Sequence, residues 1–436
     1  MPSRYLVAPA LVLFWLLVGA AFVWAGQRQS ERVNLSAAAG GQYPYLTYAW
    51  RIAESGLGEW RGDRNRMPLY PLLLSTVGDG DWNTFVERST SFAITSSAAA
   101  LAVIGVLSYW GLSVWPATVL TLAAAVCIFI YKASFVQAEL LYYALFYAAW
   151  LVLCRLLHGP SVLWGLAGGL CVGLAYLTKA SGMAILLPYL AAAGVQIVAL
   201  LFARRPAVLA DLAAQDRRRC LAVLRSAVIA GLGFLVVVYP YISSNKSRFG
   251  RYFYNVNTSF FMWCDSWPEA KSFADKYQIT DHYPDAPPDA VPGPLAYWRQ
   301  HTMGRIAHRL GYGVITLASI AADQPIFKYL VATLAFCVFF GMKEKRRLRE
   351  LWSEYWCTAL FCVLGFGGYL AVFAWYAVVA YGGRFVLSLL LPAMFVLLWL
   401  CERIGQVARP VLLLGYRVRK STAFWIIMLV FLLGEG

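Results

Sequence analysis

Three arginines close together in a polar stretch have the side chains best suited to hold a phosphate. Arg61, Arg64 and Arg66 fall within six positions and precede an amphipathic stretch from Met67 to Leu74. A guanidinium group offers forked donors in a fixed geometry that matches phosphate oxygens. A solvated basic loop that faces lipid headgroups would have the same composition, so both interpretations stay open.

Four more charged residues stand beside apolar runs, where an ionisable side chain is costly and is by default a functional candidate. Lys132 and Glu139 flank one junction between two runs. Lys179 lies at a second junction, and Arg384 opens a late run. Each has a structural alternative, because a lysine at a helix end extends its ammonium to the membrane surface and a glutamate caps a helix amino terminus.

The histidines and cysteines predict neither a metal site nor a disulfide framework. His301 and His308 form only a loose pair, and His158 is far from both in the sequence. Of the nine cysteines, only Cys264 lies well inside a polar loop. The sequence therefore indicates no particular cofactor. A divalent metal stays open, but the ligand spacing does not indicate one.

These residues belong to a chain with the composition of a membrane protein. It has 436 residues, 60% hydrophobic and 14% charged, with a mean hydropathy of +0.60. The apolar runs lack the alternation of barrel strands, so they are expected to be helices. We predict an all-α polytopic membrane protein with about eleven transmembrane helices. The expected spans are 5–26, 89–110, 112–131, 139–157, 161–178, 182–203, 221–242, 325–342, 357–380, 384–402 and 422–434.

The net charge of +15 arises from basic residues at the ends of the runs and in the loops between them. When the spans are counted, basic clusters at 204–219, 343–349 and 403–420 share one side with the amino terminus. The positive-inside rule makes that side the cytoplasm and places two long loops, 27–88 and 243–324, outside. The chemistry-bearing residues then share the outer face. No nucleic-acid motif accompanies the charge, so no nucleic-acid partner is expected.

The chain is expected to have three parts. Residues 1–242 form an N-terminal transmembrane module with outer loop 27–88, residues 243–324 form an outer cap, and residues 325–436 form the C-terminal transmembrane helices. The cap should end in an amphipathic basic helix near 298–310. Few ionisable residues fall near the middle of the spans, which counts against a transporter.

Four stretches of the predicted outer face follow one another in order. They are Gln42-Tyr43-Pro44-Tyr45-Leu46 with Arg64 to Pro71, Ala138-Glu139-Leu140, Gly173 to Lys179, and Tyr239-Pro240 with Asn245 and Phe249-Gly250. Together with Gly383-Arg384-Phe385 to Pro392, they resemble the GT-C class of membrane glycosyltransferases. The nearest likeness is to the branch of the protein mannosyltransferases and the lipid A aminoarabinose transferase. No single motif is specific, whereas the ordered set on one face is.

The resemblance implies a glycosyltransferase that takes a sugar from a polyprenyl-phosphate donor at the outer face of a bacterial inner membrane. The acceptor would be a lipid, a glycan or a protein, and membrane lipids would surround the enzyme. Basic residues of the family neutralise the phosphate leaving group. The cations that match them are Arg64, Arg66, Lys179 and Arg384. The other substrate-binding residues implied are Gln42, Tyr43, Tyr70 and Asn245.

The sequence departs from the family at the catalytic base. The family has an Asp shortly after the first span, and Gly41 stands there in this chain. Since glycine cannot accept a proton, either the alignment is shifted, another carboxylate serves, or the chain is inactive. The alternative carboxylates are Asp63, Glu139 and Glu54. Non-catalytic handling or flipping of lipid-linked sugars is the second hypothesis, and an oligosaccharide polymerase or ligase is the third.

Overall fold

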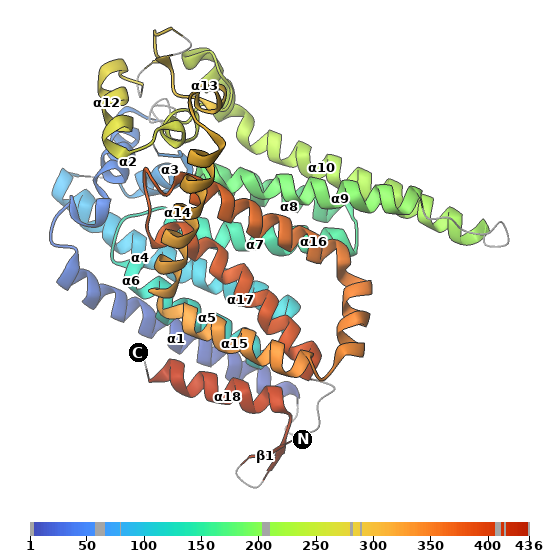
Figure 1. The fold of residues 1–436 in the computed structure, drawn as a ribbon. Coiled ribbons are helices and arrows are strands. Elements are labelled where there is room, and N and C mark those ends of the chain that lie inside the picture. The colour runs from blue at the N-terminus through green and yellow to red at the C-terminus, as the bar shows by residue number, and fades with distance from the viewer. Residues whose placement is uncertain are drawn as a thin grey trace.

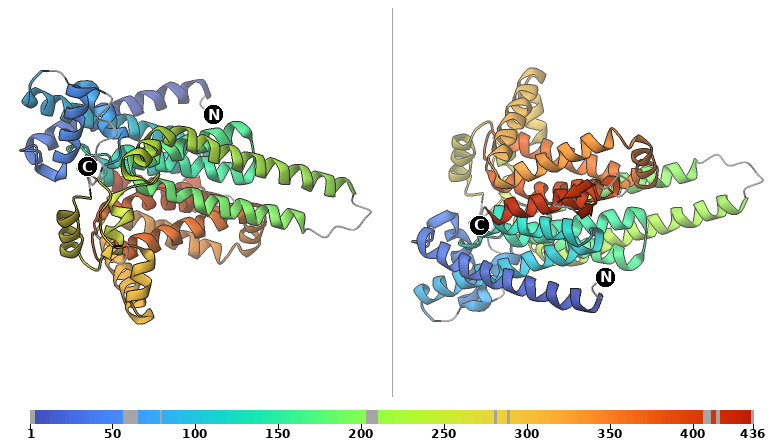
Figure 2. Two further views of the ribbon diagram at one scale, coloured as in Figure 1. Left: turned by 90° about the horizontal axis from the view of Figure 1, so that it is seen from above. Right: turned by 90° about the horizontal axis from the view of Figure 1, so that it is seen from below.

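The computed structural model describes residues 4–56, 66–78, 80–202, 210–279, 282–287, 290–405, 411–413 and 416–434. Within these ranges the chain is almost wholly helical. The strands described are a short antiparallel pair, β1 (Val411–Leu413) and β2 (Tyr416–Val418). Figures 1 and 2 show long helices packed in one bundle, with short helices gathered at one end.

The first half of the bundle runs from α1 to α9. Its helices are α1 (Arg4–Val33), α2 (Tyr43–Ser55), α3 (Leu69–Leu74), α4 (Trp82–Gly111), α5 (Val114–Ala124), α6 (Ile130–Ala133), α7 (Glu139–His158), α8 (Val162–Thr178) and α9 (Leu186–Leu201). A π-helical stretch, Ala125–Phe129, joins α5 to α6, and a 3₁₀ turn, Ala180–Ile185, leads into α9.

The second half begins with the longest helix. Its helices are α10 (Ala210–Phe249), α11 (Val256–Ser259), α12 (Trp267–Tyr277), α13 (Pro294–Gln300), α14 (Met303–Ala322), α15 (Pro325–Gly341), α16 (Lys345–Tyr376), α17 (Gly383–Gly405) and α18 (Lys420–Leu433). Figure 1 places α2, α3, α12 and α13 at the same end of the bundle, which we call the cap end.

Within the described residues all eleven predicted spans fall on helices, although α10 begins at Ala210 and α16 at Lys345, well before the predicted starts at 221 and 357. Among the described residues, seven helices are long and apolar enough to cross a membrane, and the bent pair α14–α15 brings the number to eight. Helix α8 and residues 421–433 are apolar but shorter. The protein is therefore a polytopic membrane protein of the all-α class, while the predicted count of eleven is not confirmed.

The basic helix expected near 298–310 is instead two helices, α13 and α14. His301 has an extended backbone between them, and the Thr302 hydroxyl caps α14 by accepting a hydrogen bond from the Arg305 amide at 3.4 Å. Helix α14 then continues to Ala322 because apolar residues follow its basic start. It meets α15 at an angle of 95°.

Small residues bring α8 close against α10. A Cβ added at Gly165 would lie 2.7 Å from the Ser226 carbonyl oxygen, and one added at Gly173 would lie 2.7 Å from Val237 Cβ. Gly169, between them, would place its Cβ in collision with the Ala230 carbonyl oxygen. Glycines spaced in this way allow two helix backbones to approach closely. This packing fixes the carboxyl end of α8, where Lys179 follows.

Candidate functional site

An ion pair between Lys179 and Glu139 lies at the cap end of the bundle. Lys179 Nζ is 3.6 Å from Glu139 Oε1, and the two side chains are 24% and 7% exposed. Glu139 is the first residue of α7, and Lys179 directly follows α8 with an extended backbone (φ −155°, ψ 128°). Within the described residues, Glu139 Oε2 is buried without a hydrogen-bond partner. The helix break thus turns the Lys179 side chain toward the start of α7.

Two further cations lie near the same carboxylate. Besides Lys179, both Arg384 at the start of α17 and Lys132 at the end of α6 interact electrostatically with Glu139. A third cation, Arg66, comes from the segment before α3. Arg66 and Arg384 both interact with Tyr376, so Arg66 belongs to the same group. We call these five residues, Arg66, Lys132, Glu139, Lys179 and Arg384, the cationic cluster.

Aromatic rings line the cationic cluster. The Arg66 guanidinium lies 5.1 Å from the centre of the Tyr45 ring, and Tyr45 packs edge-on against Tyr70 at 5.8 Å. Lys179 Nζ is 5.5 Å from the Tyr142 ring and 6.0 Å from the Phe385 ring. Ring faces attract cations, so these contacts hold the charged groups in place without neutralising them.

Tyr70 of α3 offers a hydroxyl beside the cationic cluster. Burial raises the pKa of Tyr70 far above its ordinary value, and the nearby Tyr45 and Glu139 add to the effect. Its phenol therefore stays protonated at neutral pH and can donate a hydrogen bond.

A small hydrogen-bond network supports the turn that carries Lys179. The Tyr369 hydroxyl donates to the Ser181 carbonyl at 2.7 Å, and Ser181 Oγ donates to the Tyr142 hydroxyl at 3.1 Å. Gly182 leaves no room for a side chain, because a Cβ there would lie 2.6 Å from the Ala175 carbonyl carbon. The backbone around Lys179 is therefore held from α7, α8 and α16.

Gln42 lies behind the cationic cluster and is fully buried. Its amide nitrogen donates to Asn34 Oδ1 at 2.5 Å and to the Ser36 carbonyl at 2.9 Å, and its Oε1 accepts from the Val136 amide at 3.0 Å. These bonds tie the end of α1 to the segment that leads into Glu139. Gln42 thus helps to position Glu139, while direct contact with a substrate stays a prediction.

The remaining predicted site residues lie elsewhere or outside the described ranges. Asp63 and Arg64 are outside them. Glu54 is exposed in the last turn of α2, and Tyr43 is 52% exposed and packs on Trp82. Buried Asn245 donates to the carbonyl groups of Tyr252 at 3.1 Å and Tyr254 at 3.4 Å. No described contact joins these last three side chains to the cationic cluster.

Gly40 and Gly41 form the turn that precedes α2. Both have positive φ angles, of 59° and 73°, which glycine adopts without strain. A Cβ at Gly40 would lie 2.6 Å from the Phe135 ring, whereas one at Gly41 would have nothing within 4 Å. The Gln137 amide donates to the Gly40 carbonyl, so the turn lies next to the segment before Glu139.

The sequence marked Lys132 as a charged candidate beside the same junction as Glu139 but did not assign it to the phosphate site. Tyr45 stood only within a resembling stretch, and Tyr142 and Tyr376 were not singled out. Residue type alone does not distinguish these tyrosines, since the chain has 26 of them and most could equally be core residues.

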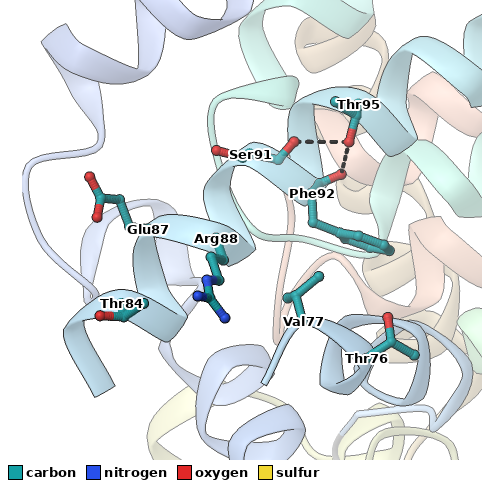
Figure 3. A pocket seen from close by; sticks show the side chains of 8 residues that line it. All are labelled: Thr76, Val77, Thr84, Glu87, Arg88, Ser91, Phe92 and Thr95. Atoms are coloured by element: carbon teal, nitrogen blue, oxygen red, sulfur yellow. Dashed lines mark hydrogen bonds between the residues drawn. The ribbon is translucent and has the colours of Figure 1, made fainter. Parts of the chain in front are cut away.

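A hollow of about 710 Å³ lies apart from the cationic cluster, on α4 and the turn after α3 (Figure 3). Four small hydroxyl residues, one carboxylate, one arginine and two apolar residues line it, namely Thr76, Val77, Thr84, Glu87, Arg88, Ser91, Phe92 and Thr95. Thr95 Oγ1 donates to the Ser91 carbonyl at 3.0 Å and the Phe92 carbonyl at 3.2 Å, so this hydroxyl is used within its own helix. As for metals, no three His, Cys, Asp or Glu side chains of the described residues could hold an ion together.

Comparison with known proteins finds a low level of similarity. No protein-family model and no curated protein matches the chain. ArnT from Cupriavidus metallidurans bound to undecaprenyl phosphate aligns with 98% of this chain and 88% of its own, at 13% identity and a TM-score of 0.35. ArnT in the apo state aligns with 91% and 78%, at 15% identity and a TM-score of 0.34. ArnT is a GT-C aminoarabinose transferase, which is the class that the ordered stretches resemble. Similarity at this level assigns no function.

Proposed function

We propose that this protein is a GT-C glycosyltransferase that moves a sugar from a polyprenyl-phosphate donor to an acceptor at the outer face of the cytoplasmic membrane. The observation that supports the proposal is the convergence of Lys179, Arg384 and Lys132 on Glu139 at the cap end of a membrane bundle. Three cations of the cluster surround one carboxylate, Arg66 shares Tyr376 with Arg384, and such a site favours an anion.

The proposed reaction needs the cations when the bond between the sugar and the phosphate of the donor breaks. The acceptor oxygen forms a bond to the anomeric carbon of the sugar, and the bond from that carbon to the phosphate oxygen breaks. Negative charge then grows on the departing polyprenyl phosphate. Lys179, whose side chain is 24% exposed, and Arg384, which is exposed, are donors already in position, and preorganised donors of this kind lower the barrier. Arg66 and Tyr70 would hold the other phosphate oxygens.

The acceptor hydroxyl must lose its proton to a base. Of the three candidate carboxylates, Asp63 lies outside the described residues and Glu54 is exposed at the end of α2. Glu139 is in the cationic cluster, and one of its oxygens has no hydrogen-bond partner there. We therefore assign the role of general base to Glu139, which would also keep Lys179 in place.

The direct test measures binding of undecaprenyl phosphate to the purified full-length chain in nanodiscs. We expect Lys179→Ala and Arg384→Ala each to weaken binding at least tenfold, because a charge-assisted hydrogen bond to phosphate contributes about 1.5–3 kcal/mol. Lys271→Ala and Arg299→Ala remove exposed charges from α12 and α13 and should bind as the natural chain does. Unchanged binding in both cluster variants, with thermal melting intact, would rule out the phosphate site.

Gly41 favours a second candidate, a protein that binds or moves lipid-linked sugars without transferring them. The two candidates differ in turnover. The transferase should release undecaprenyl phosphate from a panel of undecaprenyl-phosphate sugars when outer-membrane and periplasmic extracts supply acceptors. Tight donor binding with no release across the panel, together with lipid movement across vesicle membranes, would favour the second candidate.

A further inference from the structure

A second polar cavity, of about 600 Å³, lies between α13, α14 and the loop before α12. It shares no residue with the cationic cluster. Its lining is unusually rich in histidine and arginine, and consists of Asp265, Tyr297, His301, Gly304, Arg305, His308, Arg309, Tyr312 and Val378. The loose pair His301 and His308 and the basic start of α14 both belong to it.

One wall of this cavity is internally paired. Asp265 accepts hydrogen bonds from the Tyr297 hydroxyl at 2.7 Å and from Arg309 at 3.1 Å, and it pairs with His301 Nε2 at 2.7 Å. The buried Arg309 also donates to the carbonyl groups of Trp375 at 2.9 Å and Met262 at 3.0 Å. These residues therefore have few hydrogen-bonding groups left for a ligand, and they form a rigid wall of the cavity.

The other wall presents donors without partners. Arg305, His308 and Tyr312 lie on α14 at spacings that bring them to one face of the helix. No side-chain hydrogen bond or ion pair joins any of the three to another described residue. Since the Asp265 charge is already matched by Arg309, the open wall has a net positive charge.

The cavity lies where α14 changes from polar to apolar. Beyond Tyr312 the helix exposes Val314 at 42% and Ile315 at 73%. Helix α14 meets the apolar α15 at 95°, so it runs across the direction of α15 and does not continue it. Apolar side chains exposed on α14 face lipid. The basic start of α14 therefore lies at the level of the lipid headgroups, on the cap side.

From this arrangement we infer that the cavity is a binding site for the phosphate headgroup of an anionic lipid in the leaflet on the cap side. The forked guanidinium of Arg305 would hold two phosphate oxygens, and the His308 ring and Tyr312 hydroxyl would donate to the headgroup. The acyl chains would run along the exposed apolar face of α14. This site does not depend on the proposed transfer reaction.

Native mass spectrometry of the full-length chain can test the inference, with phosphatidylglycerol as the probe. We expect a tightly bound phosphatidylglycerol that Arg305→Ala/His308→Ala weakens at least tenfold, or about 1.4 kcal/mol. Lys179→Ala should retain it, because Lys179 belongs to the other site. Arg299→Ala is the matched control, since it removes an exposed arginine one helix away that does not line the cavity.

Two further probes separate a lipid headgroup from a free anion. Diacylglycerol, which has the same tails without phosphate, should not occupy the site, and millimolar inorganic phosphate should displace phosphatidylglycerol only weakly. Equal binding of phosphatidylglycerol by the double variant and the natural chain would overturn the site. So would equal losses in the double variant and Arg299→Ala. Inorganic phosphate that binds as tightly as the lipid would overturn the assignment to a lipid.

Discussion

Asp265 Oδ2 lies 2.7 Å from His301 Nε2, and this contact joins the loop before α12 to the residue between α13 and α14. The His301 ring also stacks on Tyr297 with ring centres 3.8 Å apart, and its Nδ1 is 3.0 Å from the Tyr297 carbonyl oxygen. Tyr297 and Arg309 bind the same carboxylate, so one side chain connects the loop before α12 with α13 and α14.

Cap stability should fall in acid. Burial alone would raise the pKa of Asp265. The hydrogen bonds from Tyr297 and His301, together with the charges of His301 and Arg309, outweigh burial and lower this pKa. A group whose pKa is lower in the folded state stabilises the fold above its unfolded value of about 3.9, and the contribution is lost as pH falls through the folded pKa. We expect the thermal midpoint of Asp265→Asn to lie about 2 °C below that of the natural chain at pH 7. The thermal midpoints of the variant and the natural chain should converge as the pH falls toward 3. A constant difference between them from pH 7 to pH 3 would show that the Asp265 charge does not stabilise the fold.

Glu139→Gln separates the two roles of Glu139. If Glu139 takes the proton from the hydroxyl of the acceptor substrate, the Glu139→Gln variant should have a kcat about 100-fold lower. Undecaprenyl phosphate should bind as well as before, or better, because a negative charge near the phosphate is removed. The measurement is kcat beside donor affinity for the variant and the natural chain. Weakened donor binding with normal kcat would limit Glu139 to holding Lys179.

The turn before α2 offers a matched pair of variants. Gly41→Ala should cost about 1 kcal/mol, the price of a left-handed backbone, since its Cβ has open space. Gly40→Ala should cost clearly more, because its Cβ would also collide with the Phe135 ring. Thermal melting of both variants in detergent checks the order. Gly41→Asp, which supplies the acid of the family, should fold like Gly41→Ala because aspartate tolerates this backbone. Equal melting of Gly40→Ala and Gly41→Ala would contradict the described turn.

Contact between α8 and α10 is expected to control the position of Lys179. Gly169→Ala drives a methyl group into the Ala230 carbonyl and should destabilise the protein by about 3 kcal/mol. It should also weaken undecaprenyl phosphate binding, since α8 ends at Lys179. Gly194→Ala in α9 meets nothing within 4 Å and should be neutral or slightly stabilising, because alanine favours helix. Melting and binding measured together test both statements, and a Gly169→Ala variant that matches Gly194→Ala would refute the close contact.

The apolar runs were sufficient to predict the helices, because a backbone in lipid has no other way to satisfy its hydrogen bonds. They did not reveal the break at His301 between α13 and α14 or the continuation of α14 to Ala322, since the basic helix was expected only near 298–310. Lys179, Glu139 and Arg384 could be selected singly, as costly charges beside spans. Their convergence depends on how α7, α8 and α17 pack, and no local pattern encodes that.

The contacts of Asp265 also could not be predicted from local sequence patterns. Arg309 and Asp265 are 44 positions apart, and neither is notable in a loop rich in charged and aromatic residues. The partners of Gln42 could not be predicted for a related reason. A polar residue in a family-like stretch looks like a ligand, but three backbone and side-chain partners surround Gln42 in the fold.

The separate origins of the cationic cluster also imply an order of assembly during synthesis. Glu139 and Lys179 belong to neighbouring helices, α7 and α8, and can pair as soon as that hairpin enters the membrane. Arg384 arrives only with α17, after every other member of the cationic cluster has been made. The Lys179–Glu139 pair can therefore form before Arg384 exists, and the cluster is complete only when α17 packs against α7.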